Sequence, residues 1–192
     1  MNILMGCTIL GTGGGGDLDE GIDRIDEALA AGRQFRLVDI DALDPDALIG
    51  VPYSVGDISP QTEANARKYA HATRPEENMY LRNLEQLERF LGRELSAVIC
   101  TELGGDNTAI AFYVAAMTDS LIVDGDPAGR SVPGLQDSTF FLRQIPICPM
   151  AVMNESGDGA IFTSVTDDAR ADGMDHARRS GGVRPAQLRL RF

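Results

Sequence analysis

The amino-acid sequence predicts an α/β domain, with a mostly parallel sheet and flanking helices. Two short, β-prone apolar runs at 95–100 and 121–123 enclose an apolar stretch at 109–117 that is long enough for a packed helix. A strand–helix–strand order of this kind favours parallel strands, because the intervening helix carries the chain back to the same end of the sheet. A chain of 192 residues with 43% hydrophobic residues can bury one core, so we expect a single domain.

The other segments fit this fold class. Apolar residues recur at helical spacing from Ile22 to Leu29, and Gly32 closes that pattern. A second helix is expected at 75–91, ended by Gly92, with an apolar stripe made of Met79, Leu81, Leu84, Leu87, Phe90 and Leu91. The remaining expectations are a strand at 35–40, a turn or short helix at 41–48, strand and loop at 50–56, and an exposed loop at 60–73.

The charge distribution divides the chain. Residues 170–192 hold six arginines against two aspartates, whereas the whole chain has a net charge of −12. We therefore expect an α/β domain at 1–169 and a basic tail at 170–192. The tail can be a flexible segment, an edge strand, or unrelated sequence that follows a truncation or frame shift.

Composition excludes several classes of protein. A net charge of −12 argues against a nucleic-acid partner, which would need clustered basic residues. No apolar run reaches the roughly 18–20 residues that span a membrane, and the N-terminus lacks the basic start of a signal peptide. Cys7, Cys100 and Cys148 are widely spaced in apolar surroundings, which predicts buried free thiols and a reducing, cytoplasmic setting.

The glycine run at 11–17 is the most unusual local feature. Consecutive glycines suit a backbone that needs positive φ angles or the close approach of a ligand or another segment. Asp17 can cap the following helix, and its charge opposes a phosphate, so three readings stay open: a capped turn, a substrate- or metal-facing loop, and a nucleotide loop. The ligand-facing candidates are Gly13, Gly14, Gly15, Gly16 and Asp17.

Two acidic, glycine-containing loops follow the predicted parallel strands, at 102–107 and 124–130. Ligands of open α/β sheets bind beyond the carboxyl ends of the strands, so these loops should form one rim. The rim residues are Glu102, Asp106, Asn107, Asp124, Asp126 and Arg130. They can hold a hard cation, supply general acid–base groups, or serve as turn formers and helix caps, with Asp106, Asn107 or Thr108 as the cap. With two histidines, His71 and His176, a histidine-based zinc site or a Ser-His-Asp triad is not expected.

Three separated motifs, at 11–17, 102–107 and 123–136, resemble the N-terminal domain of the S-methyl-thiohydantoin desulfurase-like family, over residues 3–168. The resemblance implies an α/β domain followed by a second domain, and hydrolytic removal of a sulfur substituent from a hydantoin-like ring. Three departures stand out. Relatives more often carry glutamate at the position of Gly134 and methionine near Ala128, they have a leading helix before the glycine motif, and they continue into the second domain. We therefore expect either a truncated product or a natural single-domain relative.

From these observations we expect a hydrolase-like domain that acts on a hydantoin or thiohydantoin-type ring. The expected catalytic residues are Glu102, Asp124, Asp126 and Arg130. The expected substrate-binding residues are Gly13, Gly14, Gly15, Gly16, Asp17, Gly104, Gly105, Asp106 and Asn107. A water molecule, bound to a divalent metal or activated by a carboxylate base, would attack the ring, while backbone N–H groups or Arg130 would hold charge on a ring nitrogen. The alternative is a non-catalytic binding or assembly module, or a fragment of a two-domain enzyme, whose partner is a second domain, a hydantoinase-like protein or another copy of the chain.

Overall fold

The computed structural model describes residues 2–55, 63, 78–134, 137–154, 156–163 and 190–191. Its central sheet has the strand order β1-β5-β4-β2, with β1 at Leu37–Val38, β2 at Ile49–Gly50, β4 at Ala97–Ile99 and β5 at Leu121–Val123. All three strand pairs are parallel, and Val98 lies opposite Ile122 in the register of β4 and β5. The predicted α/β class and parallel β4–α5–β5 unit are therefore confirmed.

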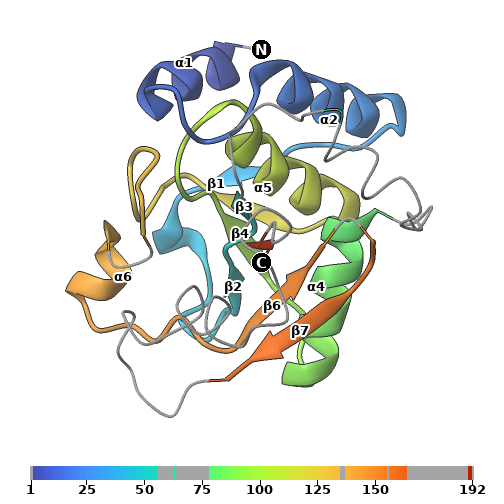
Figure 1. Ribbon diagram of the computed structural model, residues 1–192. Helices are drawn as coiled ribbons and strands as arrows, with labels where there is room; N and C mark the ends of the chain where they lie inside the picture. Colours follow the sequence, from blue (N-terminus) through green and yellow to red (C-terminus); the bar gives the residue numbers. More distant parts are fainter. Residues whose placement is uncertain are drawn as a thin grey trace.

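The helix α5, Gly105–Thr118, lies at the centre of the molecule (Figure 1). It is apolar on all sides, which is typical of a helix that other elements cover completely. Ile110, Ala111 and Val114 are at most 1% exposed and pack against the strands β4 and β5. On its other side, α5 contacts α2, Leu18–Ala30, and α1, Asn2–Gly11.

The helices α2 and α4 each have a capping side chain, and they begin and end close to where the sequence predicts. Asp17 caps α2, since its side chain accepts hydrogen bonds from the N–H groups of Asp19 and Glu20. The helix α4, Met79–Leu91, is capped by Asn78 and ends at Gly92, which has a φ of 65°. One member of the predicted apolar stripe differs, because Phe90 is 52% exposed.

Several shorter elements complete the described part of the chain. They are the 3₁₀ helix η1 at Ile40–Ala42, the strands β3 at Ser54–Val55, β6 at Met150–Met153, β7 at Gly159–Phe162 and β8 at Leu190–Arg191, and the helix α6 at Thr139–Leu142. The antiparallel pair β6–β7 packs on α4, and the side-chain amide of Asn83 donates to the carbonyl of Ala151. The sequence analysis did not predict this hairpin. β8 pairs with β3 antiparallel.

Two expectations about helix starts are wrong. The apolar segment before the glycine run is the helix α1, although the sequence analysis expected no leading helix. Asp106, Asn107 and Thr108 do not cap α5, because Gly104 is the N-cap residue and these three are buried inside the first turn. The carbonyl of Gly15 accepts hydrogen bonds from the N–H groups of Asp106 and Asn107, at 3.1 and 2.9 Å. The glycine run therefore supplies the acceptor that a capping side chain would otherwise provide.

Some expectations fall outside the described residues. These are the loop expected at 60–73, apart from Glu63, and the tail at 170–192, apart from Leu190 and Arg191. Within the residues that the structure describes, no helix combines the length and the apolar character needed to cross a membrane.

Candidate functional site

The glycine run packs against the loop that leads into α5. A Cβ atom on Gly104 would lie 2.4 Å from the Cα atom of Gly15, and one on Gly15 would lie 2.6 Å from the Cα atom of Gly104. A Cβ atom on Gly105 would likewise lie 2.6 Å from the Cα atom of Leu18, and one on Gly16 would lie 2.4 Å from the Cβ atom of Asp106. The glycines thus permit two backbone segments to touch, which is the close-approach role that the sequence suggested.

The exposed part of the glycine run is less constrained. Gly13 has a φ of 95° and nothing within 4 Å of a hypothetical Cβ atom, while a Cβ atom on Gly14 would meet the side chain of Ser131. Gly13, Gly16 and Asp17 are exposed, whereas Gly14 and Gly15 are half-buried. Ligand binding by this run stays a prediction.

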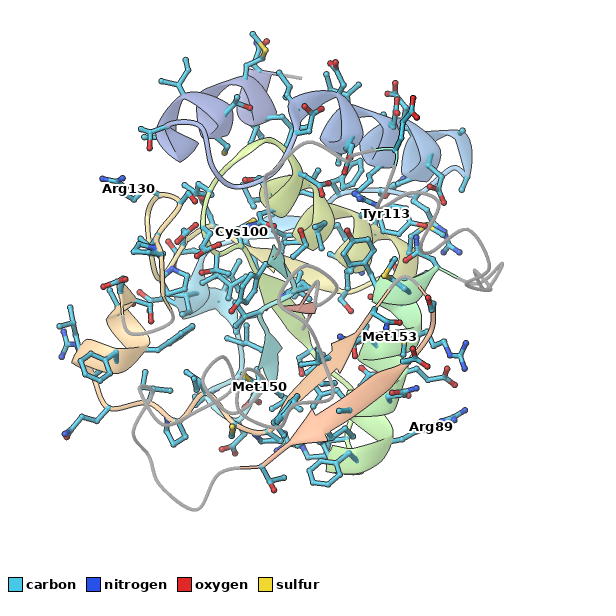
Figure 2. All side chains as sticks on the ribbon, viewed as in Figure 1. Arg89, Cys100, Tyr113, Arg130, Met150 and Met153 are labelled. Carbon is cyan, nitrogen blue, oxygen red and sulfur yellow. The ribbon has the colours of Figure 1, made fainter. Side chains whose placement is uncertain are left out.

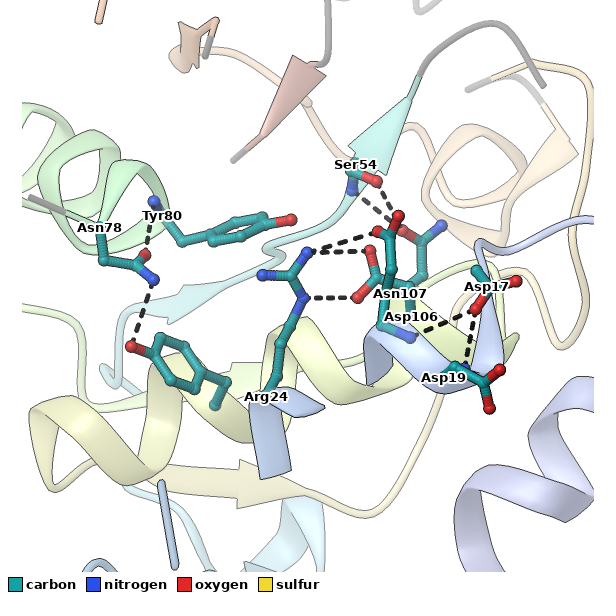
Figure 3. Close-up of polar contacts among 10 residues, drawn as sticks. Asp17, Asp19, Arg24, Ser54, Asn78, Tyr80, Asp106 and Asn107 are labelled. Carbon is teal, nitrogen blue, oxygen red and sulfur yellow. Dashed lines mark hydrogen bonds and ion pairs between the residues drawn. The ribbon is translucent and has the colours of Figure 1, made fainter. Parts of the chain in front are cut away.

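The first acid of α5 is neutralised inside the protein. The guanidinium of Arg24 on α2 binds both carboxylate oxygens of Asp106, with Nε 2.5 Å from Oδ1 and Nη2 3.3 Å from Oδ2 (Figure 3). The same guanidinium lies 4.7 Å from the ring centre of Tyr80, and Asp106 is only 2% exposed. Asp106 therefore joins α2 to α5, and its carboxylate is directed to Arg24.

A cavity of about 260 Å³ lies beside β2 and the carboxyl end of β4. Its wall is mostly apolar, and Glu102 is the one charged side chain among its described lining residues. Uncharged polar side chains of the lining include those of Tyr53, Thr101, Ser138 and Cys148. An apolar cavity with few polar groups is the usual form of a small-molecule site.

Glu102 has an unusual backbone and an unusual acidity. Its φ is 54°, a left-handed conformation that non-glycine residues seldom adopt and that is frequent at functional sites. Burial raises the pKa of Glu102 to about 7, and the negative charge of Asp126 adds to this, while a hydrogen bond from the backbone of Val132 opposes it. Asn107 donates from Nδ2 to Oε2 of Glu102 at 3.4 Å. A carboxyl group that titrates near neutral pH is suited to general acid–base catalysis.

Asp126 holds the two acidic loops together. Its carboxylate accepts backbone N–H groups from Leu103, at 3.0 Å, and from Gly129, at 2.6 Å, as well as from Ala128. Burial raises the pKa of Asp126, although these hydrogen bonds lower it in part. The described contacts give Asp126 a positioning role, because they fix the loop that carries Glu102.

The remaining rim candidates lie apart from the cavity. Asp124 and Arg130 are exposed and do not line it, and Figure 2 shows Arg130 at the outer edge of the molecule. Arg130 donates from Nε to the carbonyl of the neighbouring Ser131. Across the residues that the structure describes, no group of three or more His, Cys, Asp or Glu side chains has a geometry that could hold a metal ion.

The sequence analysis missed part of the cavity wall. Tyr53 is 3% exposed, and its pKa is raised well above its ordinary value, by burial and by the charge of Glu102. Tyr53 follows β2, which is parallel to its neighbour β4, so the strand-end rule that selected Glu102 could also have selected this position. Cys7 and Cys100 are buried free thiols as predicted, but Cys148 is only half-buried and lines the cavity.

Residues 1–164 match the family described as S-Me-THD-like, N-terminal domain. The chain belongs to this family. Its S-Me-THD-like fold is similar to the crystal structure of a protein from Chromobacterium violaceum, at 26% identity and a TM-score of 0.59. The match covers 85% of this chain and 43% of that protein, so the chain spans less than half the length of this relative. No curated protein matches the sequence. The expected family is thus confirmed.

Proposed function

We propose that this S-Me-THD-like domain takes part in the hydrolysis of a hydantoin or thiohydantoin-type ring, with Glu102 as the general base. The observation that carries the proposal is the place of the Glu102 carboxylate in the wall of a mostly apolar cavity, beyond the carboxyl end of β4. A flat, weakly polar ring suits such a cavity better than a phosphate or a sugar does. Membership of the S-Me-THD-like family supports the ring class.

The reaction needs a base that accepts a proton from water and an acid that protonates the leaving sulfur. Ionised Glu102 would accept a proton from a water molecule while the water oxygen forms a bond to the ring carbon, and the electron pair of the C=N π bond moves to the ring nitrogen. The C–S bond then breaks, and protonated Glu102 returns the proton to the leaving thiolate. The second proton of the water moves to the ring nitrogen, so the products are a thiol and a ring carbonyl. A base with a pKa of about 7 can perform both transfers near neutral pH.

Other residues would support this base rather than react. Asp126 fixes the backbone of the loop on which Glu102 lies, through its bond from the N–H of Leu103. Asn107 donates to Glu102 and accepts the backbone N–H of Ser54 at 3.0 Å, so it links the base to the segment after β2. Thr101 and Ser138 line the cavity and offer hydroxyl groups to a ring carbonyl or nitrogen.

The test is the thiol released from an S-alkylated thiohydantoin by the wild-type chain and by Glu102→Gln. We expect a loss of about 10²–10⁴-fold in kcat for this variant, and a wild-type rate that rises with pH through an apparent pKa near 7. Glu94→Gln, at an exposed glutamate that does not line the cavity, is the matched control. Full activity in Glu102→Gln would rule out this residue as the base.

A second candidate function, an assembly module, is favoured by the outer face of α1. Ile3, Met5, Ile9 and Leu10 on this helix are between 50% and 77% exposed. Neighbouring apolar side chains at a surface are typical of protein contacts. The partner would be a second domain, a hydantoinase-like protein or another copy of the chain. Light scattering at two protein concentrations, compared between wild type and Ile9→Asp, tests self-association. A monomeric mass for both proteins would exclude the second copy.

A further inference from the structure

The cavity that contains Glu102 has two chemically different ends. Thr101 and Glu102 follow β4, at the carboxyl edge of the sheet, whereas Leu48 and Leu95 precede β2 and β4, at its amino edge. All four residues line the same cavity. With a rise of about 3.3 Å per strand residue, the two edges are on the order of 15–20 Å apart. The cavity therefore extends along the sheet, away from Glu102.

The end away from Glu102 is lined by aliphatic side chains. Leu87 and Leu91, from the last turns of α4, face the cavity together with Leu95, and Met150 of β6 adds a buried side chain that is 1% exposed. Figure 2 shows Met150 in the lower interior of the molecule, near β6 and β2. None of these lining residues has a polar side chain, so bound water would find few hydrogen-bond partners there.

A glycine makes room for one of these aliphatic side chains. Gly50 of β2 is buried and lines the cavity, and a Cβ atom there would lie 2.3 Å from Cδ1 of Leu95. Any larger residue would push the Leu95 side chain out of its present place. The present position of the Leu95 side chain in this wall thus depends on the absence of a side chain at position 50.

We propose that the aliphatic end, formed by Leu48, Leu87, Leu91 and Leu95, is a subsite for an apolar substituent of the ring. The substrate class is then a hydantoin-type ring that carries an aliphatic or aromatic side chain of several carbon atoms. This inference rests on the proposed function for the ring itself, but the subsite is defined by different residues. An apolar side chain replaces poorly bonded water, and each buried methylene tightens binding by roughly fourfold.

The experiment is a calorimetric titration of the wild-type chain with thiohydantoins that carry hydrogen, methyl, isobutyl or benzyl at the ring carbon. A second series of linear alkyl amides, from four to eight carbons, probes the subsite without a ring. We expect Kd to fall along both series. In Leu91→Trp the isobutyl and benzyl compounds should lose about tenfold or more in affinity, while the unsubstituted ring binds as before. Gly50→Ala should act in the same direction through Leu95.

The control is Leu29→Trp, since Leu29 is 54% exposed on α2 and lies outside the cavity lining. Thermal unfolding of each variant shows whether it is folded, and Gly50→Ala provides a smaller change if Leu91→Trp is not. Rings that bind with equal affinity whatever their substituent would overturn the inference and leave the proposed function standing. If the alkyl amides bind and the rings do not, the proposed function and this substrate class both fail, although an apolar subsite remains. Binding of neither series would overturn the subsite as well.

Discussion

Glu102 follows β4 and Asp106 lies four residues later in the first turn of α5, yet the two acids have opposite electrostatic surroundings. Asp106 is 2% exposed and forms a two-point ion pair with Arg24, under the ring of Tyr80. Glu102 faces a cavity with Asp126, another acid, as its charged neighbour, and its pKa is raised to about 7. The first carboxylate is paired with a cation inside the fold, whereas the second faces a cavity beside another acid.

The difference shows how two acids that are close in sequence can have different structural surroundings. The ion pair of Asp106 fixes α2 against the first turn of α5, and the carbonyl of Gly15 fixes the same turn from another side. Glu102 precedes this anchored turn and has a left-handed φ of 54°. Burying a carboxyl group whose pKa is raised lowers the free energy of unfolding at neutral pH. The ion pair of the neighbouring Asp106 contributes to the stability that offsets this cost.

The largest effect is expected where the paired carboxylate loses its partner. Arg24→Met leaves Asp106 buried without a cation, so the free energy of unfolding should fall by about 3–5 kcal/mol. Arg89→Met is the matched control, because Arg89 forms an equally short pair with Glu85 on an exposed helix surface and should lose less than about 1 kcal/mol. Urea unfolding at pH 7 measures both. Equal effects in the two variants would show that burial of the Arg24–Asp106 pair has no consequence.

The next effect concerns the backbone contact that supports both acids. Gly104→Ala would place a Cβ atom 2.4 Å from the Cα of Gly15, so the two loops must separate at a cost of about 3 kcal/mol. Gly6→Ala, at a helical position with nothing within 4 Å, should be neutral or stabilising by up to about 1 kcal/mol. Thermal unfolding of the two variants tests this. An unchanged Tm for Gly104→Ala would contradict the proposed tight contact.

A smaller, pH-dependent effect is expected for the unpaired carboxylate. The pKa of Glu102 is raised from 4.5 to about 7 in the folded chain, so the folded state holds this proton more tightly than the unfolded state. Its contribution to stability is complete below pH 4.5 and is lost as the pH rises through about 7. Because the carboxylate retains contact with solvent, we expect a change of about 2 kcal/mol rather than the full value of the shift.

Glu102→Gln should remove this part of the pH dependence. The difference in unfolding free energy between the variant and the wild type should therefore grow in favour of the variant from pH 5 to pH 8. Glu94→Gln, at an exposed position, should follow the wild type at both pH values. A constant difference between Glu102→Gln and the wild type across this range would show that Glu102 titrates normally.

The smallest effect concerns a third acid, which is exposed, does not line the cavity, and forms no ion pair with the residues that the structure describes. Asp17→Ala removes the cap that accepts the N–H groups of Asp19 and Glu20, at an expected cost of about 1 kcal/mol. Asp17→Ser keeps an acceptor oxygen and should retain most of the stability. Chemical denaturation distinguishes them, and an equal loss in both variants would mean that the charge of Asp17 matters more than its hydrogen bonds.

The sequence by itself determined the fold class, the parallel β4–α5–β5 unit, and the cap at Asp17. These follow from local patterns, namely apolar periodicity and a side chain that bonds to its own helix. The strand-end rule also selected Glu102, because the direction of a parallel strand fixes where its following residue lies. It selected Asp106, Asp124 and Asp126 with equal weight, since all four are acids that follow strands.

Only the tertiary structure separated these acids. Arg24 lies 82 positions before Asp106, and α5 receives a cap from Gly15, so neither partner can be recognised from the local sequence. The cavity at Glu102 arises where β2, α4 and the segment around Cys148 meet β4, and its acidity depends on how much solvent these elements exclude. The burial of a carboxylate and its pairing with a cation depend on segments that are distant in sequence. Residue type and spacing could therefore name the candidate residues, but only the packing of these segments gave each carboxylate its own environment.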